Sequence, residues 1–203
     1  MADVRAVLFD ADGVLQRATP GWKQNLQSLV APDRATEFLD EVMLSEKAPL
    51  RGESSFPDEL AKVLARWNVT APLDDVLANW TRIDVFPDMV DAVGELRATG
   101  TACYLATNQH VFRTEYMRAN LGYGDLFDDV FYSCELGLAK PDPQYFGAIL
   151  ERTGRTGADT LFIDDNESNV EGARAAGLHA EHFPAEAGAT VAREILARYD
   201  LPR

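Results

Sequence analysis

The stretch VRAVLFDADGV at residues 4–14 decides the fold, because it reads as one buried strand that ends in two carboxylates. Its apolar run from Val4 to Phe9 is typical of a parallel strand covered on both faces. Asp10 and Asp12 come directly after this run, and Gly13 lets the backbone turn sharply beyond them. An Asp-Gly turn after a strand is common by itself. Its meaning therefore depends on which side chains stand at the ends of the other strands.

Four later apolar runs look like further strands, at residues 102–106, 130–132, 160–163 and 179–183. Helical patterns separate them, and each pattern closes on a glycine, a common stop of a helix. Strands that alternate with helices of this length predict βαβ units. We therefore expect an α/β fold with a Rossmann-like parallel sheet, helices on both faces, and ligands at the carboxyl ends of the strands.

Between Gln16 and Val85 the alternation stops, and only helical patterns occur. Helices are expected at residues 22–30, 34–44, 58–67 and 73–80. In the last two, apolar residues recur at the spacing of an amphipathic helix, which indicates a small bundle with Trp67 and Trp80 in its core. Because this segment follows the first strand directly, it is placed to cover the carboxyl edge of the sheet. The predicted domains are a four-helix cap at 16–85 and a catalytic core at 1–15 and 86–203.

Composition limits the class of protein. The 203 residues carry a net charge of −14 without the clusters of Lys and Arg on which affinity for nucleic acid depends, so we expect no nucleic acid partner. No segment is apolar enough to span a bilayer, and the N-terminal residues do not resemble a secretory signal, which predicts a cytoplasmic protein with no membrane partner. Cys103 and Cys134 are too few for a disulfide framework. The oligomeric state is not readable from the sequence.

Polar side chains follow the other core strands as well. They are Thr107 and Asn108 after the second strand, Lys140 beyond the third, and Asp164 and Asp165 at the end of the fourth. Because the carboxyl ends of parallel strands lie at one edge of a sheet, these groups should meet the two carboxylates of the first strand. Carboxylate oxygens suit Mg²⁺. The sequence therefore predicts a pocket for a divalent cation and a phosphate group.

These segments resemble, in order, the four motifs of the haloacid dehalogenase superfamily. The matching residues are DADGV at 10–14, Thr107 in LATNQ, Lys140 in LAKPDP and the acidic pair in FIDDN. The helical insertion resembles the small (C1) cap of that family. RGESSF and DDNESNVEGARAAG resemble the branch of sugar-phosphate phosphatases and the phosphatase domains of soluble epoxide hydrolases. The resemblance implies a Mg²⁺-dependent phosphohydrolase that cleaves a small phosphate monoester, such as a sugar phosphate, through an aspartyl-phosphate.

The resemblance also implies roles in catalysis. Asp10 would be the nucleophile, and Asp12 the general acid that protonates the leaving oxygen and then activates water. Thr107, Asn108 and Lys140 would bind the phosphoryl group, with Thr107 and Lys140 counted as catalytic. This division of labour is chemically sound, because a carboxylate nucleophile splits one difficult displacement into two easier steps, and a neighbouring acid avoids the release of a bare alkoxide.

For Mg²⁺, the resemblance implies coordination by Asp10, by the backbone carbonyl of Asp12 and by the Asp164–Asp165 pair. Asp165 is expected in direct contact and Asp164 in a water-mediated or orienting role, an order that the sequence leaves open. Asn169 resembles a position that supports the acidic loop, although its spacing also fits the first turn of the next helix. The partner would be a small phosphorylated metabolite that the sequence does not identify.

Three other functions use the same fold. A phosphomutase of the β-phosphoglucomutase type shares all four motifs, and the core residues do not separate it from a phosphatase. A haloacid dehalogenase would carry an aromatic residue where this chain has Asp12. A catalytically dead binding protein would lack the nucleophile, the lysine or the acids, and none is missing. Outside the motifs, His110 is expected to cap or flank a helix, and Lys47 and Arg51 are interpreted as solvated charges or, second, as leaving-group contacts.

Overall fold

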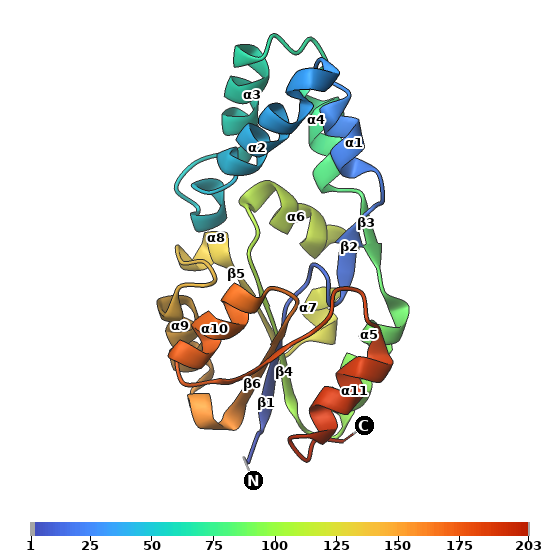
Figure 1. Cartoon of the computed structure of the whole chain (residues 1–203). Coiled ribbons are helices and arrows are strands. Elements are labelled where there is room, and N and C mark those ends of the chain that lie inside the picture. The colour runs from blue at the N-terminus through green and yellow to red at the C-terminus, as the bar shows by residue number, and fades with distance from the viewer. Residues whose placement is uncertain (1–2, 203) are drawn as a thin grey trace.

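The central sheet is parallel and has β1 in its middle, as the α/β pattern predicted. In the computed structural model, which describes residues 3–202, the strands lie in the order β5-β4-β1-β6-β7 (Figure 1). Their bounds are β1 (Ala6–Phe9), β4 (Ala102–Thr107), β5 (Asp129–Tyr132), β6 (Thr160–Asp164) and β7 (His179–His182). The strand order brings the carboxyl ends of β4, β1 and β6 side by side at the edge that faces the cap.

Helices cover both faces of the sheet, because successive side chains of β1 point to opposite sides. Val7 and Phe9 pack into one apolar cluster, and Ala6 and Leu8 pack into another. The first cluster is closed by α5 (Pro87–Ala98), α7 (Tyr123–Leu126) and α11 (Ala189–Ala197). The second is closed by α9 (Pro143–Thr153) and α10 (Glu167–Ala175). Both faces are thus occupied, and a ligand can reach the sheet only at its ends.

A two-stranded antiparallel ribbon, which the sequence did not predict, leads from the core to the cap (Figure 1). It pairs β2 (Gln16–Ala18) with β3 (Ile83–Val85). Beyond it lie α1 (Trp22–Gln27), α2 (Ala35–Ser45), α3 (Phe56–Arg66) and α4 (Leu73–Leu77), with 3-10 turns at Pro32–Arg34, Pro49–Arg51 and Ala78–Trp80. These elements share an apolar cluster of their own. The helical cap was therefore predicted correctly in kind, while its first and last helices are shorter than expected.

The cap also contacts the core away from this ribbon, at α6 (Val111–Asn120) and α8 (Ser133–Leu136). The ring of Phe56 stacks on His110 with ring centroids 4.1 Å apart. Gly52 has a φ of +69°, and a Cβ atom there would lie 2.4 Å from the carbonyl oxygen of Cys134. Only glycine permits so close an approach of the two backbones. The cap is consequently held over the site from two sides.

Within residues 3–202, no helix is both long and apolar enough to cross a membrane. Both cysteines are free thiols, as their number predicted. The cytoplasmic location and the residue boundaries of the two domains stay predictions.

Candidate active site

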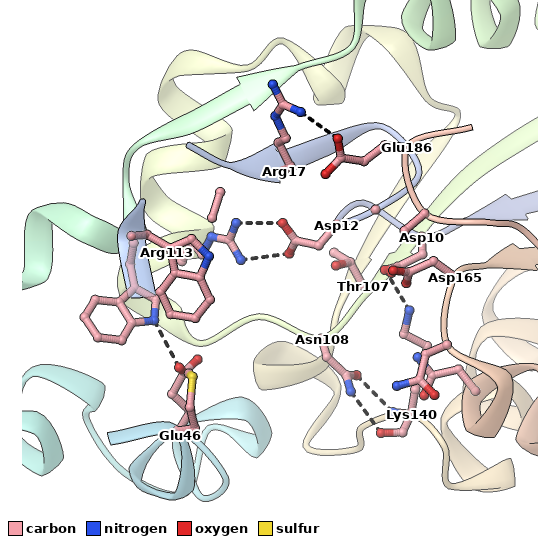
Figure 2. A pocket seen from close by; sticks show the side chains of 18 of the residues that line it. Asp10, Asp12, Arg17, Glu46, Thr107, Asn108, Arg113, Lys140, Asp165 and Glu186 are labelled. Carbon is pink, nitrogen blue, oxygen red and sulfur yellow. Dashed lines mark hydrogen bonds and ion pairs between the residues drawn. The ribbon is translucent and has the colours of Figure 1, made fainter. Parts of the chain in front are cut away.

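A cavity of about 610 Å³ separates the carboxyl edge of the sheet from the cap. Its core walls come from the loops after β1, β4 and β6, and its cap walls from α1, the end of α2 and the turn before β3. Figure 2 shows Asp12 between Arg113 on one side and the Asp10–Lys140 pair on the other. Of the site residues expected from the sequence, all except Asp164 line this cavity, and Asp164 lies buried directly behind it.

Lys140 joins two of the expected carboxylates. Its ammonium donates to Asp10 Oδ1 at 2.7 Å and to Asp164 Oδ2 at 2.6 Å, and its side chain is 1% exposed. Burial lowers the pKa of Lys140, but the attraction of Asp10 and Asp164 outweighs it and raises that pKa overall. Burial raises the pKa of Asp10 to about 7, with the charges of Asp164 and Asp12 adding to it and Lys140 opposing it. The nucleophile candidate thus needs positive charge nearby to stay ionised at neutral pH.

Three carboxylates stand close enough to share one metal ion. One oxygen each from Asp10, Asp164 and Asp165 lies within 4.8 Å of the other two. Asp164 also accepts from Asn169 Nδ2 at 3.1 and 3.0 Å, which confirms that Asn169 supports the acidic loop. Asp165 instead borders the cavity. Gly13, at a φ of +83°, passes so close to Asp165 that a Cβ atom on Gly13 would lie 2.2 Å from Asp165 Oδ2. These hard oxygen donors fit Mg²⁺.

Thr107 ends β4 and Asn108 follows it, and both line the cavity. The hydroxyl of Thr107 is buried and accepts from the side chain of Gln109 at 3.0 Å. The side chain of Asn108 is taken up by the backbone of Lys140, to whose carbonyl it donates and from whose amide it accepts, both at 2.9 Å. Asn108 therefore fixes the loop that carries the lysine. Phosphate binding by Asn108 stays a prediction. Because its side chain is bonded to Lys140, the backbone amide of Asn108 is the group that would bind the phosphate.

The sequence did not reveal the partners of Asp12. Both of its carboxylate oxygens accept from the guanidinium of Arg113, at 2.7 Å each. Gln109 Nε2 and Gln16 Nε2 add one bond apiece, at 2.8 and 3.1 Å. Burial alone would raise the pKa of Asp12, but Arg113 and the two glutamines hold it below its usual range. A signal was available in the position of Arg113, because the first turn of a helix that follows a core strand borders the ligand edge.

The cap contributes Glu46, a second residue that the sequence did not reveal. Its carboxyl lines the cavity and accepts from Trp80 Nε1 at 3.1 Å. Burial raises its pKa to about 7, with the Trp80 bond opposing. Trp80 lies in the bundle core as predicted and also borders the cavity, which was not expected. Lys47 and Arg51 are exposed and lie outside the cavity lining, so their first interpretation as solvated charges is favoured.

His110 begins α6 and caps it, as expected, because its Nδ1 accepts from the backbone amide of Arg113 at 3.2 Å. Nδ1 is an acceptor, so the ring proton resides on Nε2, which lies 3.8 Å from the carboxyl of Glu46. Burial, with the nearby charge of Arg113, lowers the pKa of His110 to about 3. The ring is therefore uncharged near neutral pH and gives Glu46 no cationic partner.

Known proteins resemble this chain in sequence and in fold. A family model described as haloacid dehalogenase-like hydrolase matches residues 4–177. The chain is 30% identical to a phosphoglycolate phosphatase of Rhodospirillum rubrum over 86% of its own length and 77% of that protein. It is also 33% identical to the sesquiterpene phosphatase AstK of Aspergillus oryzae, but this match covers only about half of each protein, 47% of this chain and 48% of AstK. Among solved structures, HAD family enzyme bt-2542 of Bacteroides thetaiotaomicron, a magnesium complex, matches with a TM-score of 0.78 at 21% identity over 91% of this chain and 95% of that one.

Proposed function

Because the chain belongs to the haloacid dehalogenase-like hydrolase family, we propose that it hydrolyses a small phosphate monoester with Mg²⁺ as its cofactor. The observation that carries the proposal is the setting of Asp10, whose carboxylate meets the cavity 2.7 Å from Lys140 Nζ and within 4.8 Å of carboxylate oxygens of Asp164 and Asp165. A carboxylate alone would repel a phosphate dianion. A lysine and a cation site beside it are what an anionic substrate requires.

In the first step the Asp10 carboxylate attacks phosphorus. An Asp10 O–P bond forms, the P–O bond to the leaving group breaks, and an aspartyl-phosphate results. The leaving oxygen takes its proton from Asp12, which must give up one of its four hydrogen bonds to carry that proton. In the second step Asp12 accepts a proton from water, whose oxygen attacks the phosphorus and releases phosphate and free Asp10.

The remaining residues hold the phosphoryl group. Lys140 supplies a buried ammonium, and Thr107 supplies a hydroxyl at the end of the neighbouring strand. Asp10, the Asp12 carbonyl and Asp165 would bind Mg²⁺ directly, while Asp164, whose oxygens already serve Lys140 and Asn169, would orient the site. The bound ion would supply positive charge that stabilises the phosphoryl oxygens as negative charge develops.

The relatives named above as phosphatases support hydrolysis, and Asp12 argues against a dehalogenase, in which an aromatic residue would stand there. A phosphomutase would use the same core residues. The two are separated by turnover, because a mutase needs a bisphosphate primer and returns a phosphate ester, whereas a phosphatase releases inorganic phosphate without one.

The test is phosphate release from a panel of phosphorylated metabolites and para-nitrophenyl phosphate, with Mg²⁺ and with excess chelator. We expect release that depends on Mg²⁺ and is abolished in Asp10→Asn, with a change at the exposed Asp125, Asp125→Asn, as the matched control. Full activity in chelator would refute the metal requirement. Absence of phosphate release from every compound would refute the hydrolase.

A further inference from the structure

The reaction above leaves one buried carboxyl unused, that of Glu46 in the cap. It lines the cavity (Figure 2), and its side chain is only 15% exposed. In the described part of the chain, the indole of Trp80 is the single side chain that donates a hydrogen bond to it. The other oxygen, Oε2, faces the neutral ring of His110 at 3.8 Å, which is beyond hydrogen-bond distance. One carboxyl oxygen is thus left for a ligand.

The fold gains little from a carboxylate at this place. Glu46 is the C-cap residue of α2, where the helix dipole disfavours a negative charge. No Lys or Arg within residues 3–202 forms an ion pair with it, and Arg113, which pairs with Asp12, acts on it only through its more distant charge. Burying a charge without a close cation is costly. Glu41 on the same helix shows the contrast, because it accepts from Trp67 and pairs with Arg66 outside the cavity. A destabilising group that borders a ligand cavity points to binding.

We propose that Glu46 binds a hydroxyl group of the leaving group, and that the substrates are phosphate esters of neutral, hydroxyl-bearing small molecules. This inference rests on the proposed phosphohydrolase and assigns the specificity of the same cavity. Asp12 must face the leaving oxygen, and Figure 2 shows Glu46 on the Arg113 side of Asp12, away from Lys140. The carboxyl accepts from a hydroxyl, while the indole of Trp80 and the thioether of Met43 contact carbon.

The charges around Glu46 disfavour an acidic leaving group. Arg113 and Lys140, the buried cations of the described cavity lining, already pair with Asp12 and with Asp10 and Asp164. Arg17 pairs with Glu186, and Lys23, which also lines the cavity, is exposed and lies over the ring of Trp22. A carboxylate on the leaving group would enter beside Glu46 with no buried cation left to receive it. Above pH 7, where Glu46 with its pKa of about 7 is ionised, the two like charges repel at short range. The cavity, at about 610 Å³, also has room for more than a phosphate and a two-carbon acid.

The experiment compares substrates that differ by one group. Glycerol phosphate and phosphoglycerate share a three-carbon chain and differ in a hydroxymethyl group against a carboxylate. The phosphates of ribose and glucose extend the neutral series, phosphoglycolate extends the acidic one, and para-nitrophenyl phosphate reports the core chemistry alone. Each is assayed as kcat and KM with wild type, Glu46→Gln and the matched control Glu41→Gln.

Wild type should prefer glycerol phosphate to phosphoglycerate in kcat/KM by about tenfold or more, since a like-charge contact is added without compensation. Glu46→Gln should lower kcat/KM for the best neutral ester by about 10- to 100-fold, mainly through KM, the scale of a hydrogen bond to a charged group. Glu46→Gln should also reduce the difference in kcat/KM between glycerol phosphate and phosphoglycerate, and it should leave kcat/KM for para-nitrophenyl phosphate nearly unchanged. Glu41→Gln should match wild type on all of them.

A wild-type preference for phosphoglycerate and phosphoglycolate would overturn the inference without any variant. An equal loss on para-nitrophenyl phosphate and on the neutral esters in Glu46→Gln would also overturn it, because the residue would then act on the core chemistry. In both cases turnover of para-nitrophenyl phosphate by wild type leaves the proposed hydrolase standing. If wild type with Mg²⁺ releases no phosphate from any of these compounds, the hydrolase fails and the inference fails with it.

Discussion

The guanidinium of Arg113 binds both carboxylate oxygens of Asp12, with two parallel hydrogen bonds of 2.7 Å. This bidentate geometry fixes the side chain of Asp12 in direction as well as position. The pair spans the site, because Arg113 belongs to α6 and Asp12 follows β1. The acid that must reach the leaving oxygen is therefore held by a residue 101 positions away in the chain.

Replacing Arg113 should impair the proton transfer more than the attack on phosphorus. In Arg113→Gln, kcat for an alkyl phosphate is expected to fall by about tenfold or more, because a positioned general acid contributes at least that much. An aryl phosphate, whose leaving group needs little protonation, should lose much less. Arg113 holds the pKa of Asp12 low, so that pKa should rise in the variant. The pH profile for the alkyl substrate should therefore shift to higher pH.

Arg118→Gln is the matched control, because Arg118 lies on the same helix and pairs with the exposed Glu135. It should leave both substrates unaffected. Equal losses on alkyl and aryl phosphates in Arg113→Gln, with an unchanged pH profile, would show a purely structural role.

Mg²⁺ binding should depend on Asp165. In Asp165→Asn the affinity measured by calorimetry should fall by about 10- to 100-fold or more, since even groups behind a metal ligand have effects of that size. Mg²⁺ should also raise the melting temperature of wild type, because a ligand that binds the folded state stabilises it. Asp125→Asn, an exposed position, serves as the control. Unchanged affinity in Asp165→Asn would remove Asp165 from the metal site.

Lys140→Ala should cost both activity and stability. It removes the ammonium that contacts Asp10 and Asp164 and leaves two buried carboxylates without it. We expect kcat to fall by at least about 100-fold, the scale of losing one group that stabilises developing charge. Urea unfolding without Mg²⁺ should show a loss of about 3–5 kcal/mol. Lys140→Arg should not restore kcat, since a planar guanidinium does not replace a compact ammonium. Near-normal kinetics in Lys140→Ala would place Lys140 outside the mechanism, whereas near-normal kinetics in Lys140→Arg would show that any cation suffices there.

His110 should make the protein sensitive to acid. Its folded pKa of about 3 lies below the ordinary 6.5, so between these values the unfolded state binds a proton that the folded state does not. The contribution that uncharged His110 makes to folding stability is thus complete above pH 6.5 and is lost as the pH falls towards 3. His110→Asn keeps a capping side chain but has no imidazole to titrate. Its free energy of unfolding should therefore rise relative to that of wild type by about 1.4 kcal/mol for each unit by which the pH falls in this window. Parallel stability curves from urea titrations would contradict this.

The core site could be predicted from the sequence because its signals are local. Asp10 and Asp12 come directly after an apolar run, and a parallel sheet places the ends of its strands at one edge. Arg113 was missed although its place in the first turn of the helix after β4 was a signal. Glu46 has no such signal, because it borders the cavity only once the cap has folded over the core. Lys47 was the second-choice leaving-group contact, yet the cap residue that lines the cavity is the one before it, Glu46.

Two features of the fold, the helix α11 and the β2–β3 ribbon, were not predicted from the sequence. The inward face of α11 is rich in alanine, with Ala189 and Ala192 buried beside Ile195 and Leu196. These positions have a helical spacing, so the pattern was readable from the sequence and this helix was missed. The strands β2 and β3 are only three residues long each, which is too short for an alternating pattern to show. Their pairing depends on the two ends of the cap segment meeting in space.

The central claim is that the phosphoryl group passes through Asp10, and the site of phosphorylation tests it most directly. Asp12→Asn is mixed with para-nitrophenyl phosphate and Mg²⁺, quenched in acid, and mapped by peptide mass spectrometry. The acidic leaving group permits the first step, while loss of the base slows attack by water, so an aspartyl-phosphate should accumulate. We expect one phosphoryl group on Asp10, and none when Asp10→Asn is added. A phosphoryl group on any other residue would contradict the account.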